Sequence, residues 1–283
     1  MKNAKTDFIT ALTLHDKAQS VATCKGGDLL IVIGTLLSRD NQIMLHEIAT
    51  CVQEENASLV YLFTMEEKSL QTQTTFFSRY EAGSEEGVLA LLAQALLADI
   101  EIPLSLQTYF DNLDDGYLSA ESNMGEEEIE AIQSLYRQSQ NVVLVLGADL
   151  VTHPRANNIA RLAGLIATYG KAKILLSPND TIITSETNES MLEEVASLKS
   201  FDGVVIYRCP ALNQEEEGCL MGSLQFQMAA KVQHGERIQV VINQAIYPRI
   251  FVLDESLKGT IALMPCTQNE DISYRYNVAK IVK

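Results

Sequence analysis

The chain has 283 residues, 47% of them hydrophobic, which is enough to bury the core of one large or two small domains. It carries 37 acidic and 21 basic side chains, and the resulting formal charge of -16 disfavours contact with nucleic acid or anionic lipid. Its longest apolar runs are shorter than the roughly 20 residues that a membrane-spanning helix needs. We therefore expect a cytoplasmic protein that binds no nucleic acid and is not inserted directly into a membrane.

The first strongly predicted element is a buried strand that ends at Gly34 and is followed by a turn, a helix and a second buried strand. The same pattern returns 113 residues later, so that residues 29–64 align with residues 142–177 without a gap and with both strands in phase. Continuous apolar strands joined by crossover helices indicate parallel strands covered on both faces. Residues 1–200 are therefore predicted to be α/β, with two related Rossmann-like parallel-sheet units.

The helix of each unit is predicted from its apolar stripe and its first residues. In the first unit Asp40 or Asn41 is the expected N-cap, and in the second unit Pro154 is expected in the first turn. The two stripes consist of Met44, Leu45, Ile48 and Val52, and of Ile159, Leu162, Ala163 and Ile166.

A helical insertion over residues 84–139 is predicted between the two units. Ser84 is the expected cap of a helix that is apolar nearly all round and therefore lies between layers, with Glu85 and Glu86 in its first turn. A second helix follows Gly125, with Ile129, Ile132 and Tyr136 facing inward. Further along, Ser190 and Glu193 predict a capping box for a helix over 191–199.

Residues 201–283 form the second predicted part, which is irregular and β-rich. Short apolar runs separated by turns predict strands at 203–208, 237–243, 249–254 and 259–264.

The two glycine turns raise the question of nucleotide binding. A dinucleotide fingerprint needs several glycines, and a phosphate-binding P-loop ends in Gly-Lys-Ser/Thr, whereas each turn here has one glycine and no such lysine. We favour the interpretation that Gly34 and Gly147 let the chain turn off the sheet. They are then at most vestigial cofactor-binding positions, and we expect no tight binding of a pterin or nicotinamide dinucleotide.

No other catalytic or metal-binding pattern is present in the sequence, and we predict no catalytic residue and no metal site. The four histidines have no partner at metal-ligand spacing, and His153 is expected at a helix start rather than as a base. The odd number of widely spaced cysteines indicates reduced thiols that hold no metal. The acidic runs Glu126–Glu128 and Glu215–Glu217 are interpreted as solvated. The histidines are His15, His46, His153 and His234, and the cysteines are Cys24, Cys51, Cys209, Cys219 and Cys266.

Several stretches together resemble a known family. "GTLLSRDNQIMLHEIA" resembles the strand-glycine-turn of molybdopterin oxidoreductase relatives. "LVLGADLVTHPRANNIARLAGLI", "PALNQEEEG" and "LDESLKGTIALMP" resemble the C-terminal, molybdopterin-oxidoreductase-like region of the large iron–sulfur subunit of bacterial NADH-quinone oxidoreductase, respiratory complex I. "SRYEAGSEEGVLALLAQALL" fits the same subunit. The similarity spans most of residues 28–265 and corresponds to the rear part of that subunit. The family's ferredoxin-like domain and cysteine-rich cluster motifs have no counterpart here.

The chain departs from the family pattern where a cofactor would be held. Gln42 stands where the family usually has a proline, and Cys219 replaces a threonine after Gly218. Relatives that bear the cofactor continue with a pair of arginines, whereas the next arginine here is Arg237. Without charge-assisted hydrogen bonds, an acidic chain is a poor host for a pyrophosphate.

The resemblance implies a non-catalytic structural portion of this large subunit, which packs against cluster-bearing parts and other peripheral-arm subunits of complex I. It would support electron transfer from NADH or another donor to quinone at the cytoplasmic face of the inner membrane. Iron–sulfur clusters are then expected in the missing family regions or in partner subunits, with no cofactor in this chain. Two alternatives remain open: a molybdopterin- or nucleotide-binding oxidoreductase fragment, with its cofactor near Thr35 and Ala148, and a free-standing scaffold.

Overall fold

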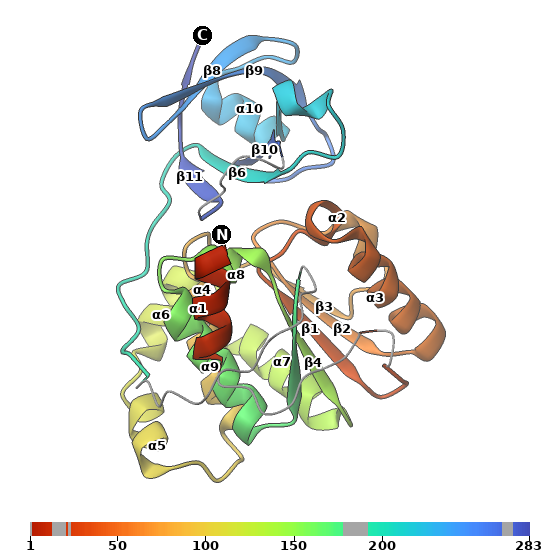
Figure 1. The fold of residues 1–283 in the computed structure, drawn as a ribbon, viewed down its shortest axis with the longest axis vertical. Helices are drawn as coiled ribbons and strands as arrows, with labels where there is room; N and C mark the ends of the chain where they lie inside the picture. Colours follow the sequence, from red (N-terminus) through yellow and green to blue (C-terminus); the bar gives the residue numbers. More distant parts are fainter. Residues whose placement is uncertain (1, 13–20, 22–23, 178–191, 268–273) are drawn as a thin grey trace. The chain divides into compact units, whose positions relative to one another are not determined.

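The computed structural model describes residues 2–12, 21, 24–177, 192–267 and 274–283. The chain divides into two compact units, Met1–Lys199 and Ser200–Lys283 (Figure 1). Within the described residues, no helix is both long and apolar enough to cross a membrane.

Unit 1 is built on one five-stranded parallel sheet. Its strands follow the order β3-β2-β1-β4-β5. Because β1 and β4 are apolar throughout and buried throughout, both faces of the sheet must be covered. The strands are β1 (Leu29–Ile33), β2 (Ser58–Leu62), β3 (Phe76–Ser78), β4 (Val142–Leu146) and β5 (Ala172–Leu176).

The predicted repeat is present as two β-helix-β units, but they share this one sheet and do not form two sheets. The first strands of the two units are neighbours, and Leu29 pairs with Val142 at the predicted offset of 113 residues. From the long helix onward the offset is 114 residues, because α3 (Gln42–Glu55) corresponds to α9 (Ala156–Tyr169). The gapless alignment is therefore wrong beyond the glycine turns, where the second unit has one extra residue.

A short helix precedes each long one, which the sequence pattern did not indicate. These are α2 (Leu37–Asp40) and α8 (Ala148–Thr152). Asn41 caps α3, since its side chain accepts from Met44 N at 3.0 Å. The prediction for Pro154 is wrong: α9 begins only at Ala156, because α8 and the bend after it occupy the preceding residues.

Helices cover the two faces of the sheet unequally. The helices α1 (Lys2–Ala11), α4 (Glu85–Leu97) and α9 lie on one side of the sheet and α3 on the other (Figure 1). As predicted, α4 lies between layers, and nearly all its residues are buried. The prediction for Ser84 is only partly right: it is at the N-cap position, but its hydroxyl donates to Glu81 O. The insertion also contains α5 (Leu104–Asp111), α6 (Asp115–Ser122) and α7 (Glu126–Gln138), in which Ile132 and Tyr136 are buried and Ile129 is partly buried.

The predicted helix over 191–199 is wrong. Residues 192–199 are irregular, and Ser190 lies outside the described residues. Leu192, Val195 and Leu198 are nevertheless partly buried against the core. Apolar residues three positions apart suggested a helix, but here they face inward from a segment that is not helical.

Unit 2 is β-rich, as predicted, with a mixed seven-stranded sheet in the order β11-β6-β10-β7-β9-β8-β12. The helix α10 (Leu224–Ala230) packs on one face, where Phe226 stacks on Phe251 at 5.9 Å between ring centroids. The strands are β6 (Val205–Pro210), β7 (Cys219–Gly222), β8 (Arg237–Ile242), β9 (Ala245–Leu253), β10 (Ile261–Cys266), β11 (Tyr276–Val278) and β12 (Lys280–Val282).

Candidate functional site

The carboxyl ends of β1 and β4 are the first place to look for a ligand site. The chain leaves β1 toward β2 and leaves β4 toward β5, so the two connections diverge at this edge of the sheet. In parallel α/β sheets, ligands generally bind where neighbouring connections diverge in this way. Gly34, Thr35, Gly147 and Ala148 all lie here, as the cofactor-binding alternative required.

The two glycine turns pack directly on each other. Gly147 N donates to Ile33 O at 2.8 Å, and Asp149 N donates to Gly34 O at 3.0 Å. A Cβ atom on Gly147 would lie 2.0 Å from Gly34 O and 2.5 Å from Thr35 Cβ. Gly34 has a φ of +73°, and a Cβ there would meet Leu150 Cγ at 2.7 Å. Close approach of one turn to the other therefore accounts for both glycines without a ligand.

The backbone amides after Gly34 are hydrogen-bonded to the chain's own acceptors. Leu36 N donates to Asp40 Oδ2 at 3.1 Å, Leu37 N to the Tyr61 hydroxyl at 3.4 Å, and Ser38 N to Glu67 Oε2 at 2.9 Å. In a phosphate-binding turn, amides at such positions bind the anion. Here the carboxylates of Asp40 and Glu67 occupy the place of that anion.

Neighbouring side chains complete this arrangement. The Thr35 hydroxyl donates to Asp40 Oδ2 at 2.7 Å, and the Tyr61 hydroxyl donates to Thr35 O at 2.7 Å. Glu67, only 5% exposed, also caps the short helix Lys68–Leu70 by accepting from Ser69 N at 3.2 Å. Burial, followed by the nearby Glu67 carboxylate, raises the pKa of Tyr61 well above its usual value. This tyrosine is therefore a neutral donor, and the network is a structural link between β1, β2 and α2.

A second set of buried polar side chains lies around the turn after β4. Glu85 and Asp149 are both fully buried, and Glu85 Oε2 lies 3.5 Å from His153 Nε2. The pKa of His153 is lowered to about 4, chiefly by burial; a hydrogen bond to Gly83 opposes this shift, and the nearby Arg155 adds to it. His153 Nδ1 accepts from Arg155 N at 3.0 Å. Its lone pair is thus engaged at the bend between α8 and α9. The prediction of a helix-start residue is wrong, since His153 is the C-cap of α8.

His153 is expected to make the protein less stable in mild acid. Its pKa is about 4 when folded and 6.5 ordinarily, so the folded state excludes a proton that the unfolded chain accepts between these values. Stability from the neutral ring is fully present above pH 6.5 and is lost as the pH falls toward 4, by about 3 kcal/mol in total.

Urea unfolding of the wild type and of His153→Asn at pH 7 and pH 4.5 measures this contribution. Asparagine keeps an acceptor for Arg155 N but does not titrate, so the variant should lose less stability on acidification. His46→Asn, at an exposed site on α3, is the control. Equal losses in wild type and His153→Asn would contradict the assignment.

The remaining sequence candidates serve local structure. No group of three or more potential metal ligands occurs among the described residues, which exclude His15. The five cysteines are free, and burial raises the pKa of Cys24, next to Cys51, to about 12. In the acidic runs, Glu128 accepts from Gly125 N at the start of α7 and Glu216 accepts from Leu212 N. These carboxylates cap turns, so the two runs are more than solvated surface.

Arg237 is closer to the Gly218–Cys219 stretch than the sequence suggests. Ile250 of β9 pairs with Cys219 on one side and with Arg237 on the other, so Arg237 lies two strands from Cys219. Two strand spacings amount to roughly 10 Å. Cys219 itself donates to Glu215 O at 3.4 Å. The stretch is a strand start, with Gly218 directly before β7.

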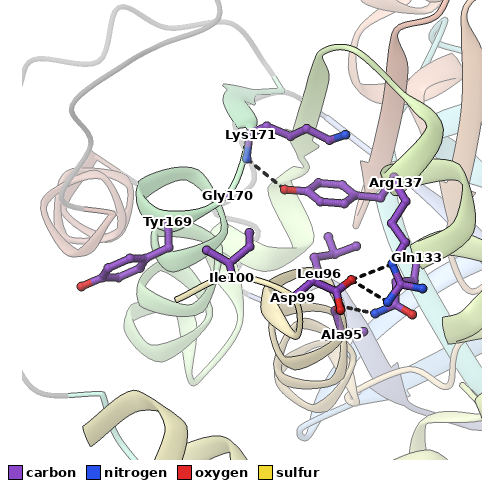
Figure 2. Close-up of a pocket in the computed structure, with 10 residues that line it drawn as sticks. Ala95, Leu96, Asp99, Ile100, Gln133, Arg137, Tyr169, Gly170 and Lys171 are labelled. Atoms are coloured by element: carbon purple, nitrogen blue, oxygen red, sulfur yellow. Dashed lines mark hydrogen bonds and ion pairs between the residues drawn. The ribbon is translucent and has the colours of Figure 1, made fainter. Parts of the chain in front are cut away.

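One recess of about 460 Å³ lies at the opposite edge of unit 1, between the ends of α4 and α7 and the α9–β5 turn (Figure 2). Its polar groups pair with one another: Arg137 with Asp99, Gln133 with Ala95 O, and the Tyr136 hydroxyl with Lys171 N. Lys171 Nζ donates to Ser139 O at 2.6 Å. Leu96, Ile100 and the Tyr136 ring also line the recess. Sequence reasoning missed it, because helix ends 35 residues apart meet there only in the fold.

The chain matches no protein-family model and no curated protein sequence.

Proposed function

We propose that this chain is a non-catalytic structural portion of the large iron–sulfur subunit of NADH-quinone oxidoreductase. In this proposal, unit 1 is a pair of Rossmann-like halves that keeps the fold of molybdopterin oxidoreductases. It packs against cluster-bearing parts and other peripheral-arm subunits at the cytoplasmic face of the inner membrane. The sequence resemblance over residues 28–265 supports the family, and the parallel sheet followed by a β-rich part is consistent with it.

The occupation of the first glycine turn by Asp40 and Glu67 is the observation that carries the non-catalytic role. A pterin or nicotinamide dinucleotide would bring a pyrophosphate to the amides of residues 36–38, where two carboxylates already accept hydrogen bonds. Bringing the pyrophosphate next to these two carboxylates is unfavourable, because like charges repel. The residues present therefore do not fit a bound dinucleotide at this turn.

The distribution of charge supports protein partners. Residues 1–199 contain 28 acidic and 13 basic side chains, whereas residues 200–283 contain nine and eight. The acidic excess thus belongs almost entirely to unit 1, which favours neighbours with basic surfaces. Unit 2, close to neutral, lacks the basic excess that nucleic-acid binding requires.

Membranes of the source organism test this function directly. Deleting the gene for the chain should abolish reduction of quinone by the complex's electron donor while succinate-dependent quinone reduction remains. Re-expression of the wild-type chain, and of an exposed-site variant such as Glu127→Ala, should restore the activity. NADH should be tried first and then other donors, such as reduced ferredoxin. Unchanged activity with every donor that the membranes accept would favour a free-standing scaffold.

A further inference from the structure

Residues 192–199, which we call the strap, are held against unit 1 by side chains that bond its backbone. Asn158 makes two such bonds, donating from Nδ2 to Glu193 O at 2.9 Å and accepting at Oδ1 from Glu193 N at 2.9 Å. Arg155 donates to Glu194 O at 2.9 Å, and the Tyr117 hydroxyl accepts from Leu198 N at 2.9 Å. Side chains from α6, from α9 and from the residue before α9 thus pair with the strap as a neighbouring strand would.

A buried carboxylate organises these contacts. Glu86, in the first turn of α4, is 1% exposed and accepts from Arg155 Nε at 3.1 Å and from Asn158 Nδ2 at 2.7 Å. It also accepts from Ala196 N of the strap at 3.4 Å. Glu86 therefore fixes the two side chains that bind the strap, besides touching the strap itself.

The strap also has an apolar seat. A Cβ atom on Gly87 of α4 would lie 2.9 Å from Leu198 Cδ1 and 3.3 Å from Leu118 Cδ2. A glycine in the interior of a helix weakens the helix, so its presence here is explained by the space that Leu198 needs. Polar and apolar contacts therefore agree on one docked position of the strap.

The outer part of the strap is held by exposed charges. Glu193 forms ion pairs with Arg155 and with Arg161, at 3.0 Å for the latter, and its side chain is half exposed. The neighbouring Glu194 has an exposed side chain with no hydrogen bond or ion pair among the described residues. Exposed pairs contribute little and are screened by salt, which makes this end of the strap the easier one to release.

The strap directly precedes unit 2, so its attachment to unit 1 sets the length of chain that connects the two units. Leu198 N donates to the Tyr117 hydroxyl in unit 1, and the Phe201 ring already packs on Tyr276 in unit 2, with 6.4 Å between the ring centroids. Residues 199 and 200 connect these two anchors. Release of the strap adds residues 192–198 to this tether, which is seven residues or about 24 Å of contour length.

We propose that the strap is a latch that controls the length of the tether between the two units. Docked, it restricts unit 2 to the reach of this short tether. Released, it lets unit 2 sample a larger volume and reach a partner surface while unit 1 stays folded. The latch does not depend on the proposed function, because it requires only the contacts within unit 1 and the length of the tether.

Spin labels on exposed positions of the two units test the latch in the full-length chain. Cysteines introduced at Glu127 and Gln225, in a Cys219→Ser background, would report the distribution of distances between the units by pulsed electron paramagnetic resonance. Glu193→Ala combined with Leu198→Ala should broaden this distribution and speed amide exchange at Glu193 and Leu198 at least fivefold. The matched control, Glu194→Ala, should change neither.

Gly87→Ala should release the strap through a change in α4 and not in the strap itself. It fills the seat of Leu198 while favouring the helix, so it should broaden the distribution without lowering the unfolding midpoint of unit 1. Faster strap exchange with an unchanged distance distribution in both variants would overturn the proposal, and so would unchanged exchange. Amide exchange in β1 and β4 confirms in each sample that unit 1 is folded.

Discussion

Gly147→Ala should lower the free energy of unfolding of unit 1 by at least about 3 kcal/mol, a large part of the 5–15 kcal/mol typical of a domain. The new Cβ would lie 2.0 Å from Gly34 O and 2.3 Å from Gly34 C, both backbone atoms that no side-chain rotation can move away. The two central strands would have to separate at their carboxyl ends. Equilibrium unfolding in urea, followed by circular dichroism, measures the loss.

Gly218→Ala is the matched control for this substitution. A Cβ there meets nothing within 4 Å, and its backbone does not have a positive φ. We expect a change within about 0.5 kcal/mol, as for other surface substitutions. If Gly147 were kept as glycine for ligand approach alone, Gly147→Ala would leave stability unchanged and weaken only binding. A loss equal to that of the control would therefore contradict the packing role.

Glu86→Ala should also be strongly destabilising, by about 3–5 kcal/mol. The substitution removes the acceptor of Arg155 Nε and of Asn158 Nδ2 at a position that is 1% exposed, leaving a guanidinium partly buried without its main partner. Urea unfolding compares it with Glu127→Ala, an exposed glutamate in the first turn of α7, which should be nearly neutral. A loss below about 1 kcal/mol for Glu86→Ala would show that the buried cluster contributes little to stability.

The strands and their layers could be predicted because burial on both faces leaves a continuous apolar run. Residues 29–33 and 142–146 are of this kind, and the shared glycine after each one located the repeat. The three-residue strand β3 was missed, since it is short and lies at the sheet edge among polar residues. The stripe of α3 was slightly misplaced, because Cys51 and not Val52 is its last buried residue.

Tertiary contacts explain the failed predictions. The pattern Leu192-Val195-Leu198 has helical spacing, but Asn158 accepts from Glu193 N and Tyr117 accepts from Leu198 N, which holds the segment in a non-helical conformation. Likewise, the extra residue before α9 is accommodated by α8 and by the bend at His153, whose ring accepts from Arg155 N. The partners of the strap lie tens of residues away, so local periodicity could not indicate them.

The candidate site was predicted in its position but not in its content. Gly34 and Gly147 indicated the edge of the sheet where the turns meet. Glu67 follows Ser38 by 29 residues, and nothing in its own stretch marks it as the acceptor for an amide of the first turn. Asp40 was considered only as a helix cap, whereas its carboxylate accepts from Thr35 and Leu36.

In our proposal, the amides of the glycine turns bond to acceptors within the chain and hold no cofactor. Calorimetric titration of the purified chain with NADH, NADPH and a guanine dinucleotide tests this most directly. A micromolar complex requires about 8 kcal/mol, and the amides after Gly34 already donate to acceptors within the chain. We therefore predict no saturable heat up to millimolar ligand. A dissociation constant near or below micromolar for any of the three, weakened by a substitution at Gly147 that leaves the chain folded, would contradict the account.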